Sequence, residues 1–185
     1  MDAKLPSKFE ENFLQRQQQG EEQEYISLNM IYYGSCLAFG AFSVILDQID
    51  NEHVYPAVHV YLAFFWCMGL NNSMGHINLV IPWSKIATFL NRMICNDTDL
   101  SVINCDEFPV VGNRKNMPED FLIRGQIWSQ HYFPVDYFKD AMAEDDGRSI
   151  EVPSLRASRM YWCLWLGCKL DKVCLISFLS MENNH

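Results

Sequence analysis

The chain has 185 residues, a length that suits one domain with a substantial core. Hydrophobic residues make up 49% and aromatic residues 14% of the sequence, which excludes global disorder. The net charge of −9 argues against a self-sufficient nucleic-acid binder, because such proteins are usually basic or carry a clear basic stripe.

The N-terminal part changes from polar to apolar at about residue 25. Residues 1–24 are rich in Gln and Glu, and we expect a solvated, partly helical lead-in there. Residues 25–46 contain no charged residue, and their apolar side chains recur at steps of three and four. This spacing predicts a helix over about 25–47. The same pattern returns in a second predicted helix over 54–71.

The two apolar runs also fit a small membrane protein with spans at about 25–46 and 54–81, since a span needs about 20 apolar residues. Asn29 in the first run, and Pro56 with His59 in the second, argue against this alternative. The flanks also lack the basic residues that orient a span. We therefore favour buried helices of a soluble domain.

The rest of the chain predicts further helices and no strand. Pro82 begins an amphipathic helix over 82–96, and the aperiodic residues 97–117 are expected to form a loop with Phe108 against the core. An ordered, apolar loop follows, then a short helix over 135–142 and a closing helix over 154–173. The predicted fold is all-α, built of antiparallel helical hairpins, with the helical domain at 25–173 and an atypical tail at 174–185.

Three motifs occur along this predicted domain. They are Pro-Trp-x-x-Ile-x-x-Phe-Leu-Asn over 82–91, then Pro-Glu-Asp-Phe-x-x-Arg-Gly over 118–125, and Leu-Trp-Leu-Gly over 164–167 after an Arg at 159. In this order they resemble the DNA/RNA-binding domain of the "ever shorter telomeres" telomerase-associated proteins and the SMG proteins of nonsense-mediated mRNA decay. The sequences of the motifs are similar to those of fungal members, and the resemblance spans about residues 25–172. It covers the C-terminal helical-hairpin part of that family's core.

The matching residues are expected to serve mainly the structure. They are Pro82, Trp83, Phe89, Leu90, Asn91, Pro118, Glu119, Asp120, Phe121, Arg124, Gly125, Trp165, Leu166 and Gly167. The resemblance implies a telomere-maintenance or mRNA-decay role in the nucleus or cytoplasm, protein partners from those complexes, and weak binding of single-stranded DNA or RNA. In that family a phosphopeptide-binding domain precedes this part, so the resemblance does not imply phosphopeptide binding by this chain.

The acidic pair and the arginine of the second motif form its most specific polar group. Asp120 and Arg124 lie at i, i+4 and can pair if the segment starts as a helical turn. Pro118 would open that turn, and Gly125 would close it with a positive φ. An arginine flanked by two carboxylates is neutralised already, so we expect Arg124 to lock the loop onto the core rather than to bind phosphate.

The candidate nucleic-acid contacts are scattered basic residues rather than one stripe. They are Arg114, Lys115, Arg148, Arg156, Arg159, Lys169 and Lys172. Four tryptophans (Trp83, Trp128, Trp162 and Trp165) lie in apolar surroundings that favour core positions over base stacking, with Trp128 the least committed to the core.

No motif points to catalysis, a metal or a cofactor. The carboxylates and the five histidines lack the spacing that a catalytic or phosphate-binding constellation needs, so we expect a protein that is not an enzyme. The seven cysteines are expected to be free, buried thiols of a reducing compartment. A zinc site from Cys163, Cys168 and Cys174 is the alternative.

The sequence therefore predicts a non-catalytic adaptor or scaffold related to telomere-maintenance or mRNA-decay factors. Two alternatives stay open: a two-span membrane protein, and an inert, truncated member of the family.

Overall fold

The computed structural model describes residues 28–75, 77–108, 116–139 and 155–174, and these are mostly helical, with no strand in the described ranges. The all-α prediction is confirmed for this part of the chain. The expected lead-in at 1–24 lies outside it, as does the tail beyond Cys174.

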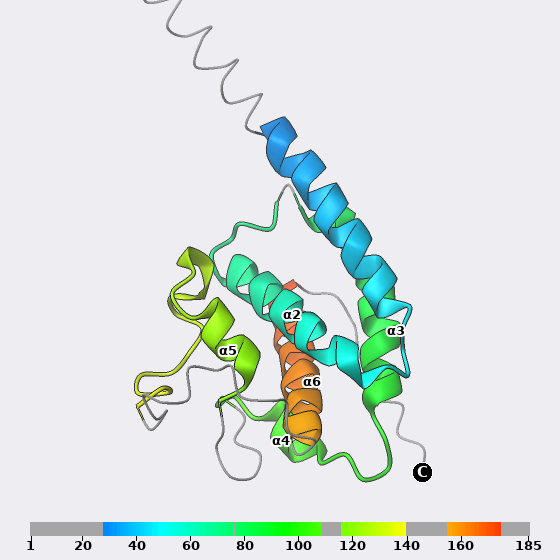
Figure 1. Ribbon diagram of the computed structural model, residues 1–185, viewed down its shortest axis with the longest axis vertical. Helices are drawn as coiled ribbons and strands as arrows, with labels where there is room; N and C mark the ends of the chain where they lie inside the picture. Colours follow the sequence, from blue (N-terminus) through cyan, green and yellow to red (C-terminus); the bar gives the residue numbers. More distant parts are fainter. Residues whose placement is uncertain (1–27, 76, 109–115, 140–154, 175–185) are drawn as a thin grey trace, which may run out of the picture.

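The first helix, described over Leu28–Leu46, packs on the body only through its C-terminal half and projects beyond it (Figure 1). Phe39, Phe42 and Leu46 are buried at the three- and four-residue spacing of one helical face. The Phe39 ring contacts the Phe65 ring at 5.1 Å between centroids, and Phe42 stacks on Tyr61 at 4.1 Å. The pairs occur in opposite order along the two segments, so the first helix and α2 (Tyr55–Leu70) are antiparallel neighbours.

The centre of the molecule is the pair formed by α2 and α6 (Leu155–Cys174), which lie side by side in Figure 1. The Cys163 thiol lies 3.9 Å from the Tyr55 carbonyl oxygen near the start of α2, and Val173 lies against Gly69 near its end. These contacts run in the same order along both helices. The central pair is therefore not an antiparallel hairpin, which differs from the expected arrangement.

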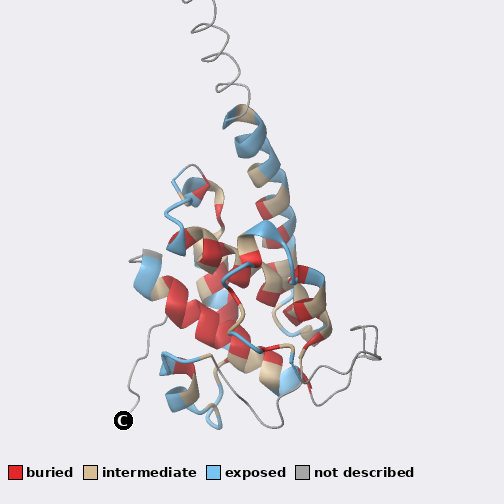
Figure 2. Ribbon diagram, turned by 90° about the vertical axis from the view of Figure 1, so that its left-hand side faces the viewer, coloured by how far each residue is buried: buried red, intermediate tan, exposed pale blue. Residues whose placement is uncertain are grey.

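Short elements surround this pair. The 3-10 helix η1 (Glu52–Val54) leads into α2, and η2 (Asn78–Val80) precedes α3 (Trp83–Met93). Then come α4 (Leu100–Asn104), α5 (Pro118–Ile123) and η3 (Ile127–Ser129). Most of the middle of α6 is buried, whereas the outer turns of the first helix are exposed (Figure 2).

Three local predictions need correction. The expected loop at 97–117 contains α4, whose first turn is capped by the Asp99 carboxylate accepting from the Ser101 backbone N–H at 2.9 Å. The expected loop at 118–125 begins as the helix α5. The expected helix at 135–142 is a series of turns over its described part, because Asp136 adopts a φ of 68°, which a right-handed helix does not accept.

Candidate functional site

The second motif is a short helix that carries two buried carboxylates. Pro118 occupies the start of α5, and Gly125 follows its end with a φ of +83°, as the sequence predicts. Glu119 and Asp120 are both buried on this helix. A buried carboxylate is costly unless it is paired or protonated, so their partners decide what the motif does.

Glu119 pairs with Arg159 of α6. The Arg159 Nε donates to Oε1 at 2.5 Å and Nη2 donates to Oε2 at 2.9 Å, a two-pronged geometry that suits a guanidinium. Arg159 is 2% exposed, so this ion pair is sealed from solvent. The pair joins the second motif to the helix that carries the third.

Two further side chains complete the surroundings of Glu119. His59 of α2 lies with Nδ1 3.3 Å from Glu119 Oε1 and Nε2 2.9 Å from the Tyr132 hydroxyl. Both ring nitrogens of His59 therefore have a polar partner in the interior. Burial alone would raise the pKa of Glu119, but the hydrogen bonds and charges of His59 and Arg159 outweigh burial and lower it to about 2.

Asp120 has a different environment. One carboxylate oxygen accepts from the Met117 backbone N–H and from the Tyr137 hydroxyl, both at 2.8 Å, and so caps the start of α5. Its other oxygen is buried without a hydrogen-bond partner in the described part of the chain. Burial raises the pKa of Asp120, which favours the protonated acid relative to an exposed aspartate.

The predicted pairing of Arg124 with Glu119 or Asp120 is wrong. Arg124 is exposed, and its guanidinium lies 4.5 Å from the centroid of the Phe138 ring. Arg159 takes the role expected of Arg124 because it reaches Glu119 from α6, 40 residues along the chain.

The first and third motifs also meet. A Cβ added to Gly167 on α6 would lie 2.6 Å from the Leu90 side chain of α3, so the glycine lets these helices approach closely. Phe89, Trp165 and Leu166 are buried, and the Trp165 indole N–H donates to the Cys105 carbonyl at 2.9 Å. Half-buried Trp83 precedes them at the start of α3 and donates to the Asn78 side chain at 2.9 Å.

The other motif residues occupy less critical places. Pro82 precedes α3 as its capping residue, Asn91 is half-buried on that helix, and Phe121 packs on the Phe138 ring at 5.4 Å. Residues of all three motifs take part in contacts between helices or cap them, and their mainly structural role stays a prediction.

Most candidate phosphate contacts that the structure describes are already paired. The prediction that Arg159 contacts phosphate is wrong, because its side chain is buried and almost none of its surface is exposed. Lys169 and Lys172 both donate to Asp106, at 2.8 and 3.1 Å, and Arg156 pairs with Glu52 at 2.7 Å. The hydrogen bonds and charges of Lys169 and Lys172 lower the pKa of Asp106 to about 2. Arg114, Lys115 and Arg148 lie outside the described residues.

The cysteines do not share one environment. Cys67, Cys163 and Cys168 are buried, Cys36 is half-buried, and Cys95 and Cys105 are exposed, so the expectation of buried thiols holds for only part of the set. Burial raises the pKa of Cys67 to about 11 and raises those of Cys163 and Cys168. Among the described residues no group of three or more histidine, cysteine or carboxylate side chains could hold a metal ion, and the zinc alternative stays a prediction because it needs Cys174. The side chain of Cys174 lies outside the described residues.

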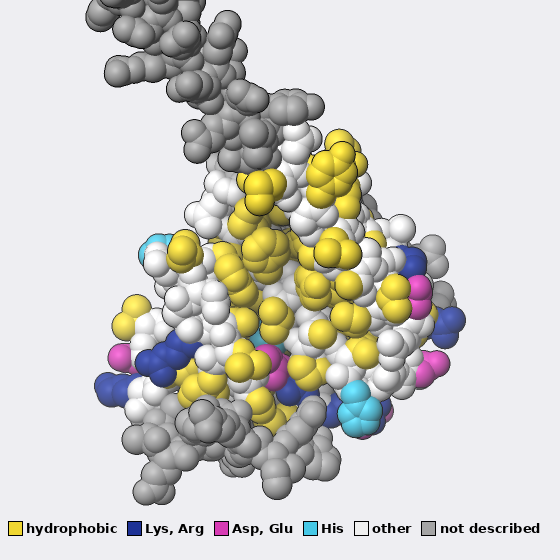
Figure 3. All heavy atoms as spheres, turned by 45° about the horizontal axis from the view of Figure 1, so that its top comes forward, with side chains coloured by type: hydrophobic (Ala, Val, Ile, Leu, Met, Phe, Trp, Pro, Cys, Tyr) yellow, Lys and Arg dark blue, Asp and Glu magenta, His cyan; other side chains and the backbone are white. Residues whose placement is uncertain are grey.

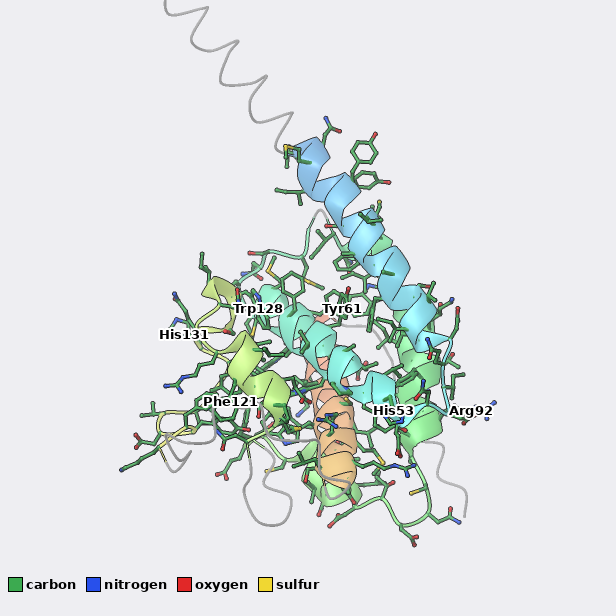
Figure 4. The ribbon with its side chains drawn as sticks, viewed as in Figure 1. His53, Tyr61, Arg92, Phe121, Trp128 and His131 are labelled. Carbon is green, nitrogen blue, oxygen red and sulfur yellow. The ribbon has the colours of Figure 1, made fainter. Side chains whose placement is uncertain are left out.

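An open hollow lies elsewhere, between the first helix and α2. It has a volume of about 440 Å³ and is lined by Met30, Ile31, Gly34, Ser35, Ala38, Phe39, Val60, Tyr61, Phe64 and Trp128. Figure 4 labels Tyr61 on α2 and Trp128 from η3, and Trp128 packs edge-on against Phe64 at 5.5 Å. We call this hollow the apolar groove. Hydrophobic side chains gather around it and along the first helix (Figure 3).

Sequence reasoning missed His59, Tyr132 and Tyr137 as members of the buried polar network. A signal was present for His59, because it is a lone ionisable residue inside an apolar helical run. Trp128, left undecided by the sequence, is half-buried and forms part of the groove wall.

Comparison with known proteins adds no family to this description. No family model matches the chain, and neither a curated protein nor a solved structure matches it. The class defined by the fold is an all-α domain with a buried ionic core and an exposed apolar groove.

Proposed function

We propose that the chain is a non-catalytic adaptor that holds an apolar segment of a partner protein in the apolar groove. The observation that supports this most is the contrast between two regions. The polar side chains that could do chemistry, namely His59, Glu119 and Arg159, are buried and bonded to one another. The groove is open and lined by apolar side chains instead.

The lining of the groove indicates the chemistry of its ligand. It contains no charged residue, and the hydroxyl of Tyr61 is already used in donating to the Ala38 carbonyl at 3.1 Å. A phosphate would find no cation there, whereas an apolar side chain of a protein partner would gain from burial. The lining of the groove therefore favours a protein ligand over a nucleic acid.

The resemblance of the three motifs suggests in which complexes and compartment the adaptor would act. The partners would be proteins of mRNA-decay or telomerase complexes, in the cytoplasm or the nucleus. Binding of single-stranded DNA or RNA would be weak, because the described basic residues Arg156, Lys169 and Lys172 are paired with acids and the chain carries a net charge of −9.

The test compares two variants in affinity purification with quantitative mass spectrometry. Val60→Glu places a carboxylate in the groove, and Leu122→Glu places one on an apolar, exposed position of α5 outside it. We expect wild type and Leu122→Glu to enrich decay or telomerase factors, and Val60→Glu to lose them while circular dichroism stays helical. Absence of both groups of factors from the wild-type sample would refute the setting. Equal enrichment by all three proteins would refute the groove.

A second candidate function, a two-span membrane protein, is favoured by one observation. By length and composition, the helices over Leu28–Leu46 and Glu52–Leu70 could each cross a membrane, although core helices of soluble proteins pass the same criterion. The second helix contains buried His59, which is bonded to Glu119 and Tyr132 of the body, and this is the behaviour of a core helix. Recovery of the chain in the soluble fraction without detergent would decide against the membrane alternative.

A further inference from the structure

A second hollow lies between the end of α5 and the turns that follow Phe133. It has a volume of about 320 Å³ and is lined by Arg124, Pro134, Asp136, Tyr137, Phe138 and Lys139. It shares no lining residue with the apolar groove and, unlike the groove, contains charged side chains. We call it the charged hollow. A ligand that suits the groove therefore does not suit this surface.

The charged hollow contains two cations and one anion. Arg124, Lys139 and Asp136 are exposed, and none of them forms an ion pair within the part of the chain that the structure describes. Arg156 and Lys169, by contrast, each pair with an acid. Two positive charges and one negative charge leave the hollow with a net charge of +1, on a chain whose net charge is −9.

The walls of the hollow are tied to one another. The Tyr137 hydroxyl donates to the Asp120 carboxylate of α5 at 2.8 Å, which joins the turns to the helix. The Arg124 backbone N–H donates to the Asp120 carbonyl oxygen at 2.9 Å, and the Arg124 guanidinium lies 4.5 Å from the centroid of the Phe138 ring. The N–H groups of a guanidinium that point away from such a ring remain available to an anion. Because the ring contact already restricts the side chain, Arg124 loses less freedom when it binds a ligand.

Charge complementarity decides the class of ligand. A carboxylate carries one negative charge and leaves the hollow neutral, whereas a phosphoryl group carries about −1.5 to −2 at pH 7 and leaves it negative beside Asp136. A nucleic-acid strand brings further phosphates against an acidic chain. A guanidinium also matches the two oxygens of a carboxylate with parallel N–H···O bonds. Asp136 in turn needs a hydrogen-bond donor, which the backbone of a peptide supplies.

We propose that the charged hollow binds a side-chain carboxylate of an acidic peptide segment from a partner protein. Arg124 and Lys139 bind the carboxylate, and Asp136 accepts from a backbone N–H of the same segment. The proposal does not depend on the apolar groove, because the two surfaces share no residue. Exposed ion pairs are weak, so a single carboxylate is expected to bind with a dissociation constant on the order of millimolar.

NMR titrations of the isotope-labelled full chain at pH 7 test the proposal, with acetyl-Gly-Glu-Gly-amide as the ligand and acetyl-Gly-Gln-Gly-amide as its uncharged control. The glutamate peptide is expected to shift the Arg124 Nε–H and Phe138 backbone signals saturably, and the glutamine peptide is not. Arg124→Gln, followed at the Phe138 signal, should weaken binding at least about fivefold. Arg92→Gln is the matched control, because it removes an exposed arginine of α3 outside the hollow and should leave the affinity unchanged.

The same titrations distinguish the other ligands. Equal shifts with the two peptides, or equal weakening by Arg124→Gln and Arg92→Gln, would overturn the proposal. Tighter binding of inorganic phosphate than of the glutamate peptide, at equal ionic strength, would assign the hollow to phosphoryl groups instead. Acetate that binds as tightly as the peptide would show that the peptide backbone is not recognised and would overturn the role of Asp136. Unchanged backbone signals far from the hollow verify that both variants are folded.

Discussion

At the scale of single residues, the partners of the buried Glu119 carboxylate explain the role of the second motif. Glu119 is buried, yet its pKa is lowered rather than raised, because the hydrogen bonds and charges of Arg159 and His59 outweigh the cost of burial. Asp120, its neighbour, lacks an arginine partner, and burial raises its pKa. The pKa values of these adjacent residues are therefore shifted in opposite directions, mainly because only Glu119 has an arginine partner.

The lowered pKa predicts how stability depends on pH. A carboxyl whose folded pKa lies below its unfolded value of 4.5 stabilises the protein above that value and loses its contribution as the pH falls toward about 2. The difference corresponds to about 3 kcal/mol. Urea unfolding between pH 6 and pH 2 should show wild type losing more stability than Glu119→Gln.

The comparison with Glu119→Gln isolates this carboxyl. Asp120 titrates in both proteins with the opposite sign, since its raised pKa makes the ionised form unfavourable in the fold. Its contribution largely cancels in the difference. Parallel pH profiles for the two proteins would show that the Glu119 pKa is not lowered.

At the scale of elements, two glycines set the distances between helices. A Cβ at Gly167 would lie 2.6 Å from the Leu90 side chain, which is fully buried between α3 and α6. A Cβ at Gly69 would lie 2.8 Å from Val173, which is partly exposed. Leu90 has no free space to enter, whereas Val173 can turn toward solvent.

Replacement of Gly69 and of Gly167 by alanine should have different effects on stability. Alanine is favoured over glycine in a helix by about 1 kcal/mol, and overpacking of a core costs about 1–3 kcal/mol. Gly69→Ala is therefore expected to be nearly neutral and Gly167→Ala to lower the unfolding free energy by about 1–2 kcal/mol. Thermal melts followed by circular dichroism measure both, and equal melting temperatures for the two variants would contradict the close contact at Gly167.

The sequence was informative about elements wherever periodicity is strong. The first helix and α3 follow apolar spacing of three and four, which indicates the buried face. α2 and α6 have no single apolar face, so the sequence there indicates a helix but not which side of it is buried. It was uninformative where a short element depends on a cap or an unusual φ. The short α4 relies on Asp99, and the turn at Asp136 needs a left-handed backbone, so neither has a periodic signal.

The candidate site was predictable only in part for a related reason. Local rules connect residues three or four apart and therefore favoured Asp120 with Arg124. The true partner of Glu119 comes from a helix 40 residues away, and only the packing of α5 against α2 and α6 brings it there. Positions of Pro118 and Gly125 were predictable because their roles depend on their own backbone.

At the scale of the whole molecule, charge and hydrophobicity are divided between inside and outside in an unusual way. A network of ionisable side chains joins α2, α5 and α6 in the interior. Apolar side chains remain exposed along the first helix and the groove. The interior ions thus serve stability and the exposed apolar surface is left for association, which is the basis of the proposed adaptor.

The buried ion pair of Glu119 and Arg159 joins α5 to α6 in the body of the molecule, and a double-mutant cycle tests its contribution most directly. Urea unfolding of wild type, Glu119→Gln, Arg159→Gln and the double variant measures the coupling between the two side chains. Each single variant should lose about 3–5 kcal/mol, because it leaves a buried partner uncompensated, and the double variant should lose less than the sum of the two. Additive losses of a few tenths of a kcal/mol, typical of exposed positions, would contradict the account.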